Sequence, residues 1–286
     1  MLVTLNEVMR IAEENKIAIG SFNTPNLESI QAVLGAAEEL NLPVIIQFAQ
    51  CHEENMELKV IGPVMVDMAK RAKVPVCVHL DHGETLDYLA QALELGFTSI
   101  MYDGSTLSFE ENVENTKKAV AMAQKMGASV EAELGSMGKR ESGSGDTEDG
   151  DDTKIYTDPE LARQFVEKTG IDALACSFGT THGIYLTTPK LDFTVVERVR
   201  EECGSIPVVM HGGSGVSAQD FRKAIQAGVR KVNYFTYMDK AGGSAVAEAV
   251  KGIQESKVLF FMELSHAAML EMKENVKEAM KIFAGM

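Results

Sequence analysis

Short apolar runs alternate with longer amphipathic stretches along the whole chain. Runs such as PVIIQF and PVVMH have few polar positions, which is typical of parallel strands that are buried on both faces. We predict eight such strands, at Lys16–Phe22, Pro43–Phe48, Pro75–Leu80, Phe97–Tyr102, Ala128–Glu133, Ala173–Ser177, Pro207–His211 and Arg230–Tyr234.

The stretches between the strands have helical periodicity, and the clearest examples are Leu27–Leu40 and Phe109–Met126. A glycine often marks the end of such a helix shortly before the next strand begins. Eight strand–helix units in one chain favour a closed parallel barrel over an open doubly wound sheet. We therefore predict an α/β fold, a single (β/α)8 TIM barrel that forms one domain over residues 1–286.

Two segments depart from this pattern of short connections. The connection Gly135–Thr157 is rich in Gly, Ser and Asp, and such long loops in compact domains are usually lids or disordered segments. Because it follows the fifth predicted strand, we expect a long mobile loop at the C-terminal face, where barrel enzymes place their chemistry. The last stretch, Val258–Phe283, is predicted to be an extended amphipathic helical region that could pack on a neighbouring subunit.

The composition excludes several classes of partner. Hydrophobic residues make up 45% and charged residues 24%, as in ordinary globular proteins. A net charge of −15 disfavours nucleic-acid binding, because an acidic surface repels phosphate backbones. The opening residues lack the pattern of a secretory signal, and no segment approaches the ~20 apolar residues of a membrane helix. With four scattered cysteines and no C-x-x-C pair, we expect a cytoplasmic protein that binds neither nucleic acid nor membranes.

Polar and ionisable side chains gather at the carboxyl ends of the predicted strands. In chain order they are Asn23, Gln47, Asp81, His82, Asp103, Glu131, Glu133, His182, His211 and Asn233. The strand interiors stay apolar, and chance placement would not concentrate polar residues at one end. The pattern therefore predicts an enzyme whose active site lies at the C-terminal face of the barrel.

Three of the six histidines belong to that face, on the third, sixth and seventh strands. Three imidazoles with an open fourth position are a catalytic zinc arrangement. A single histidine is more often structural than a metal ligand, but three at equivalent strand ends reverse those odds. The candidate zinc ligands are His82, His182 and His211. Of the other histidines, we expect His79 to be buried in the core and His52 and His266 to be exposed to solvent.

Glycine-rich and polar motifs follow the last two strands. HGGSG (His211–Gly215) comes after the seventh strand, and KVNYFT (Lys231–Thr236) runs through the eighth. Loops at these two positions commonly bind phosphate through backbone amides in barrel enzymes. The alternative is that the glycines only permit a tight turn before the helix Val216–Gly228. A Schiff-base mechanism is not indicated, because no lysine stands at the end of a predicted strand and Lys231 lies inside its strand.

Several motifs occur in order over nearly the whole chain, namely SFNTPNLESIQAVLGAAEE (Ser21–Glu39), L-D-H-G (Leu80–Gly83), E-A-E-L-G (Glu131–Gly135), H-G-x-Y (His182–Tyr185), H-G-G-S-G and the asparagine of the eighth strand. Together they resemble the class II, zinc-dependent fructose-bisphosphate/tagatose-bisphosphate aldolase family. The resemblance implies reversible aldol cleavage of a ketose phosphate into a three-carbon ketone and an aldehyde. It also implies one zinc ion per chain, a monovalent cation near the phosphate and a homo-oligomer, either a dimer or a tetramer.

The resemblance also implies roles for individual residues. Glu133 corresponds to a glutamate that ligates the metal in one state, and Asp81 to the acid/base at the C4 hydroxyl of the sugar substrate. Glu141, in the long loop, corresponds to the residue that handles the C3 proton. Zinc as a Lewis acid and two carboxylates fit this chemistry, because cleavage leaves an enediolate that needs stabilisation. The candidate contacts to substrate and phosphate are Asn23, Gly183, Gly212, Gly213, Ser214, Asn233 and Thr236.

Three positions depart from the family pattern, all around the donor half of the substrate. Leu186 replaces a lysine after H-G-x-Y, Phe235 follows the asparagine of the eighth strand, and Ala49 replaces a serine. A second interpretation therefore keeps the aldol chemistry but uses a donor without the 1-phosphate, of the dihydroxyacetone type. A third interpretation, from another class, is a barrel metallohydrolase or a metal-binding protein without catalysis.

Overall fold

A computed structural model of the chain describes residues 1–135, 156–185, 189–204, 206–251, 258 and 260–286. The predicted loop Gly135–Thr157 lies almost wholly outside the described residues, as do Glu141 within it and Leu186. The predictions that concern these residues are therefore not tested by the fold.

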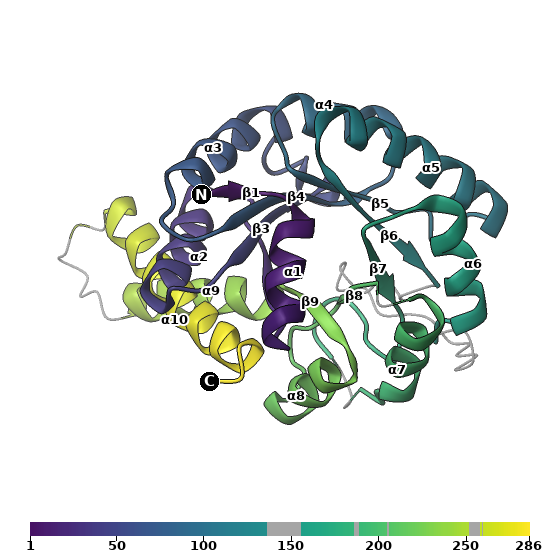
Figure 1. Cartoon of the computed structure of the whole chain (residues 1–286). Coiled ribbons are helices and arrows are strands. Elements are labelled where there is room, and N and C mark those ends of the chain that lie inside the picture. Colours follow the sequence, from purple (N-terminus) through teal and green to yellow (C-terminus); the bar gives the residue numbers. More distant parts are fainter. Residues whose placement is uncertain (136–155, 186–188, 205, 252–257, 259) are drawn as a thin grey trace.

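Parallel strands form the centre of the molecule and confirm the predicted TIM barrel (Figure 1). The sheet order is β1-β4-β3-β2-β9-β8-β7-β6-β5, and a pairing between β4 and β5 closes the ring. The barrel strands are β2 (Ile19–Asn23), β3 (Val44–Ala49), β4 (Val76–Gly83), β5 (Ser99–Tyr102), β6 (Ser129–Leu134), β7 (Ala173–Cys176), β8 (Val208–Met210) and β9 (Val229–Tyr234). These correspond to the eight predicted strands, and the short β1 (Leu2–Val3) pairs with β4 in addition.

Helices follow the strands and cover the outside of the barrel (Figure 1). They are α2 (Leu27–Leu40), α3 (Leu58–Arg71), α4 (Leu86–Glu94), α5 (Phe109–Met126), α6 (Pro159–Thr169), α7 (Phe193–Glu202) and α8 (Ala218–Ala227), with a 3-10 helix η1 (Gln50–His52) after β3. The helix predicted at Val216–Gly228 is shorter in the structure, as α8, whereas the predicted helices α2 and α5 have the predicted bounds. Each begins with a capping box, at Asn26 and Ser108, so side chains satisfy the first amides.

A helix that precedes the barrel closes its N-terminal end and was not predicted. In α1 (Leu5–Asn15), the apolar face packs against the lowest inward-facing side chains of the strands, such as Ile19 and Ile45. Lys16 caps this helix in the left-handed conformation, with φ of 53°. The first barrel strand therefore begins at Ile19 and not at Lys16, because Lys16 still belongs to the helix terminus.

Alternation along the strands separates two environments. In β6, Val130 and Ala132 face outward into the large core beneath the helices, whereas Glu131 and Glu133 face the barrel interior. The interior is apolar where α1 closes it and polar toward the carboxyl ends of the strands. Buried polar side chains of the strands, among them Gln47, Asp81, Glu133 and His211, therefore lie toward the C-terminal end of the interior, directly below the predicted active face.

The chain ends in two helices, α9 (Thr236–Lys251) and α10 (Phe261–Phe283), as the predicted C-terminal helical region requires. Helix α10 packs along α2 and α9 and is joined to α2 by ion pairs of Lys273 and Lys277 with Glu39. Its end, Phe283, packs against the barrel helix α8 through an edge-on contact with Phe221. No helix in the described part of the chain is long and apolar enough to span a membrane.

Candidate active site

A bulge in β4 turns two consecutive side chains toward the same centre. Strand alternation would send Asp81 and His82 to opposite faces, yet their Oδ1 and Nε2 atoms lie 4.0 Å apart. His82 has a φ of 46°, and the register between β4 and β5 shifts between Leu80 and Gly83. A bulge re-aims side chains in this way, and a strained non-glycine residue of this kind is typical of functional sites.

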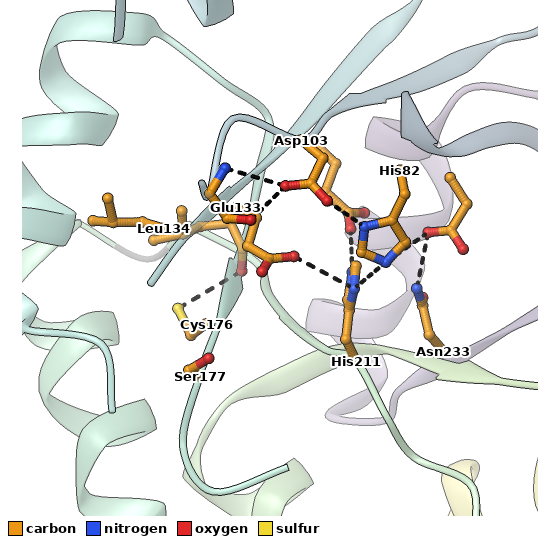
Figure 2. Close-up of polar contacts among 12 residues, drawn as sticks. His82, Asp103, Glu133, Leu134, Cys176, Ser177, His211 and Asn233 are labelled. Atoms are coloured by element: carbon orange, nitrogen blue, oxygen red, sulfur yellow. Dashed lines mark hydrogen bonds and ion pairs between the residues drawn. The ribbon is translucent and has the colours of Figure 1, made fainter. Parts of the chain in front are cut away.

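The three predicted histidines converge at the mouth of the barrel. Their ring centroids lie 4.8 to 5.6 Å apart, and the Nε2 of His82 faces the Nδ1 of His211 at 3.1 Å (Figure 2). Tetrahedral zinc with Zn–N bonds of about 2.0–2.1 Å separates its ligand nitrogens by about 3.3–3.4 Å. Together with His182, these residues form a group whose ligand atoms all lie within 4.8 Å of one another. The donor set and its spacing therefore fit a zinc ion.

Two carboxylates contact the remaining ring nitrogens of His82 and His211. The Nδ1 of His82 lies 2.8 Å from Asp103, and the Nε2 of His211 lies 2.8 Å from Glu131. Ser105 fixes Asp103 in turn by donating from its backbone amide and its hydroxyl. Such carboxylate–histidine pairs orient metal ligands and select their tautomers. The sequence placed Asp103 and Glu131 at strand ends, but it did not assign this role to either.

Glu133 adds a buried negative charge beside the histidines. Its Oε2 atom lies 3.8 Å from the Nδ1 of His211 and has no hydrogen-bond partner among the described residues. Burial and nearby carboxylates, among them Asp103, raise the pKa of Glu133 to about 8 despite the opposing effect of His82. With His82 and Asp103 it forms a second group that could hold a metal. An orphaned buried carboxylate oxygen fits a position close to a cation.

The carboxylates also act on His82. Burial disfavours its charged form, but Asp81, Asp103 and Glu133 outweigh burial and raise the pKa of His82 to about 10. The acidic surroundings thus stabilise a positive charge at this ring when no metal is bound. The same carboxylates would stabilise a divalent cation bound between the rings.

Asp81 is held by amide groups from three strands. Its Oδ2 accepts hydrogen bonds from Asn23 at 3.1 Å and Gln47 at 3.0 Å, and its Oδ1 accepts one from Asn233 at 3.1 Å. Burial would raise the pKa of Asp81, but the charge of His82 above all lowers it to about 2. The carboxylate is therefore fixed in position and ionised beside the histidine group. Asn23 and Asn233, predicted as substrate contacts, thus contact Asp81.

The predicted phosphate loops lie next to one another. Gly213 donates its amide to the carbonyl of Asn233, and the hydroxyl of Ser214 accepts from the amide of Phe235, just before α9 begins at Thr236. A side chain at Gly212 is excluded, because its Cβ would lie 2.3 Å from the carbonyl oxygen of Thr181 and its φ is 63°. These glycines therefore bring backbone close to the start of α9, where a helix N-terminus favours anions.

The H-G-x-Y motif joins two of these loops. The hydroxyl of Tyr185 donates to the carbonyl of Gly212 at 2.8 Å and accepts from the amide of Thr181 at 3.1 Å. Gly183 adopts a φ of 89°, which favours glycine over any residue with a side chain. The motif therefore ties the segment that carries His182 to the loop after β8, a contact that the sequence motif alone did not reveal.

The remaining histidines test three further predictions. His79 is fully buried and lies 2.8 Å from the hydroxyl of Ser99, as expected of a core residue, and His266 is exposed as predicted. The prediction for His52 is wrong, because this residue is only partly exposed and its ring contacts that of Phe235 at a centroid distance of 5.0 Å. An aromatic side chain from the distant β9 end covers a histidine that the local sequence suggested was free.

Comparisons with known proteins agree with this geometry. The family model for fructose-bisphosphate aldolase class II matches residues 3–285. A fructose-bisphosphate aldolase from Staphylococcus aureus is 40% identical over 263 residues, which cover 89% of this chain and 88% of the relative. The Escherichia coli protein YdjI is 38% identical over 272 residues, which cover 95% and 94% of the two chains.

Solved structures give the same result. The crystal structure of the YdjI aldolase from Escherichia coli superposes with a TM-score of 0.86 at 37% identity, over 99% of this chain and 97% of that one. A fructose-bisphosphate aldolase from Campylobacter jejuni has a TM-score of 0.82 at 25% identity, over 99% and 95%. The family is zinc-dependent, and its members are lyases. The chain belongs to the class II fructose-bisphosphate aldolase family.

Proposed function

We propose that the protein catalyses reversible retro-aldol cleavage of a ketose (bis)phosphate to a three-carbon ketone, of the dihydroxyacetone phosphate type, and an aldehyde. The observation that carries this proposal is the position of the Asp81 carboxylate, which three amide groups hold 4.0 Å from His82. A general base must lie within hydrogen-bond reach of the proton that it accepts, and the three hydrogen bonds fix the Asp81 carboxylate for such a contact. Membership of the aldolase family supports the same reaction.

In this proposal His82, His182 and His211 hold one zinc ion per chain, and Glu133 ligates it in one state. When bound, zinc supplies Lewis-acid stabilisation of negative charge on the carbonyl and hydroxyl oxygens of the substrate. Asp81 accepts the proton of the C4 hydroxyl as the bond between C3 and C4 breaks, and returns it in the reverse direction.

The second acid/base of the proposal is Glu141, which transfers the proton at C3 of the three-carbon ketone. Glu141 lies outside the described residues, so its assignment rests on the sequence motif eight residues before it, E-A-E-L-G. Asp81 and Glu141 would then act on different protons of one substrate, and their variants would have separable effects.

The phosphate of the ketone half is proposed to bind at the start of α9. The loops that carry Gly212, Gly213 and Ser214 lie beside Asn233 and Thr236, and Gly183 lies in the loop after β7. Backbone amides and a helix N-terminus suit an anion there. We include a monovalent cation near this phosphate in the proposal.

A second candidate substrate is a ketose without the 1-phosphate, whose donor half is of the dihydroxyacetone type. The contact between Phe235 and His52 favours it, because ring bulk then lies directly after β9, next to the predicted phosphate loops. The sequence also has Leu186 where the family carries a lysine, a residue that lies outside the described ones. The metallohydrolase and the non-catalytic alternatives lose support from the family match.

The test is a set of steady-state assays with ketose 1,6-bisphosphates and their 1-hydroxy counterparts, with chelator and with zinc restored. We expect zinc-dependent cleavage that is absent in Asp81→Asn, and a kcat/KM higher for the 1-phosphate. A preference for the 1-hydroxy sugar that Leu186→Lys reverses would establish the second candidate. Turnover that persists after complete removal of zinc would contradict the proposed function.

We also propose that the protein is a cytoplasmic homo-oligomer, a dimer or tetramer, built from one barrel domain over residues 1–286. Phe260, Phe261 and Met262, at the start of α10, are 56%, 81% and 77% exposed, which supports burial of this region against a neighbouring subunit. Light scattering of the purified protein measures the subunit number. A protein that stays monomeric at micromolar concentration would contradict this part.

A further inference from the structure

A fully buried ion pair lies inside the barrel below the histidines. The Nζ atom of Lys231, on β9, is 2.8 Å from the Oε2 of Glu131, on β6, and neither side chain has exposed surface. Burying two charges is costly, and replacing such a pair by apolar residues is often neutral or stabilising. Stability therefore gives little reason for a lysine at this position.

Lys231 connects two parts of the site. Its ammonium contacts Glu131, whose other oxygen accepts from the Nε2 of His211 at 2.8 Å. It also donates to the Oδ1 of Asn233 at 2.8 Å, and the Nδ2 of Asn233 donates to Asp81 at 3.1 Å. One continuous set of hydrogen bonds thus runs from a candidate metal ligand to the proposed acid/base.

Lys231 and Asp81 together decide which way the Asn233 amide faces. A lysine ammonium only donates, so the amide must present its oxygen to Lys231 and its NH2 group to Asp81. The reverse orientation would place an amide oxygen against a carboxylate and an NH2 group against an ammonium. Gln47 also donates its NH2 group to Asp81 while its oxygen accepts from the hydroxyl of Ser21, but a hydroxyl can accept as well as donate, so Ser21 does not fix that amide as an ammonium does.

Lys231 is not placed to react with substrate. Its side chain has no exposed surface, and its nitrogen is engaged by Glu131 and Asn233. A Schiff-base lysine needs a neutral amine that the substrate carbonyl can reach.

We propose that Lys231 is a positioning residue for the aldol reaction, which locks the Asn233 amide with its NH2 group toward Asp81. The inference rests on the proposed function of Asp81 as the acid/base. Through Glu131 the same lysine sets the location of Asp81 relative to His211 across the barrel. A displacement of about 1 Å in such a group costs on the order of a hundredfold in rate, although the residue that causes it never touches substrate.

The experiment compares two double variants that both remove the buried charges. In Lys231→Met/Glu131→Gln no donor remains for Asn233, whereas in Lys231→Gln/Glu131→Gln an amide donor remains at position 231. In both, the side-chain oxygen that Glu131→Gln retains can still accept from His211. The two proteins therefore differ in the hydrogen bond to Asn233 and are matched in charge and burial.

We expect both variants to bind one zinc per chain and to give the same visible spectrum when loaded with cobalt. The kcat of Lys231→Met/Glu131→Gln should fall by about 10- to 100-fold with KM within about threefold. Lys231→Gln/Glu131→Gln should recover most of that loss. In an Asn233→Ser background the two should have equal kcat values, because the group through which position 231 acts is then absent.

A readout without metal or substrate is the Asn233 side-chain amide signal in nitrogen-15 NMR spectra of the zinc-free protein, assigned by its loss in Asn233→Ser. We expect slow hydrogen exchange of this amide in the native protein and in Lys231→Gln/Glu131→Gln. Exchange should be faster in Lys231→Met/Glu131→Gln. Equal kcat values for the two double variants, or equal amide exchange, would overturn the inference. Absence of cleavage by the native enzyme with every ketose would instead defeat the proposed function, and the exchange result would still decide the role of Lys231 in orienting Asn233.

Discussion

Replacing Asp103 by alanine should weaken zinc binding without removing the site. Asp103 accepts from the Nδ1 of His82 at 2.8 Å, and its other oxygen is fixed by the amide of Ser105 at 3.1 Å and its hydroxyl at 2.6 Å. The carboxylate therefore sets the tautomer and rotation of His82, so that Nε2 faces His211. Alanine leaves the ring without this partner and also removes one negative charge beside the site.

The size of the effect follows from the loss of one orienting hydrogen bond. Loss of such a partner typically costs 10- to 100-fold in metal affinity, or about 1.4–2.8 kcal/mol at 1.4 kcal/mol per factor of ten. Asp103→Asn should lose less, because one acceptor oxygen remains. It should not match the native protein, because His82 and Ser105 then compete for that single oxygen.

The assay is a competitive titration of zinc against a chromophoric chelator at fixed pH and ionic strength, followed by kcat at saturating zinc. We expect the zinc Kd to rise in the order native, Asp103→Asn, Asp103→Ala, with kcat of the loaded variants within about tenfold of the native value. Asp87→Ala, which removes an exposed carboxylate from α4, is the control for loss of charge. An unchanged Kd in Asp103→Ala would refute the reasoning. A loss above about a thousandfold would show instead that Asp103 is itself a ligand.

Three further predictions concern the site. His211→Ala should lose both zinc, measured by mass spectrometry, and cleavage, while circular dichroism keeps the barrel signal; full zinc content would contradict the ligand assignment. Asp81→Ala should block cleavage but retain exchange of the C3 proton with deuterated solvent, whereas Glu141→Ala should do the reverse; the opposite outcome would show that the two roles are exchanged. Gly212→Ala should lower the free energy of unfolding by about 1–3 kcal/mol in denaturant titrations, because its Cβ would lie 2.3 Å from the carbonyl oxygen of Thr181; an unchanged value would show that the loop relaxes freely.

The fold could be predicted because its strands are buried on both faces. Segments such as Val44–Ala49 and Val76–Leu80 must be almost wholly apolar on the outer face, and the polar residues that they contain mark the interior near the active end. Helix α1 escaped prediction although it has a capping box at Thr4 and an apolar face. This helix precedes the first strand and closes the N-terminal end of the barrel. A pattern of repeating strand–helix units does not predict such an additional helix.

The candidate site could be predicted only as far as residue types at strand ends reveal it. The sequence does not reveal which of these residues orient the others, because that depends on the direction in which each side chain points. Strand alternation alone would have turned His82 away from Asp81, and only the bulge with φ of 46° brings them together. His52 shows the same limit, since its cover comes from Phe235 on another part of the barrel.

Two features of this site conflict with local stability, and both affect the positions of Asp81 and the histidine group. The left-handed conformation of His82 strains the backbone directly beside Asp81, and the buried Lys231–Glu131 pair holds Asn233 against Asp81 and Glu131 against His211. Natural sequences depart from local rules mainly at functional positions. That both departures converge on Asp81 and the histidine group indicates that the barrel interior is organised around the relative placement of these side chains.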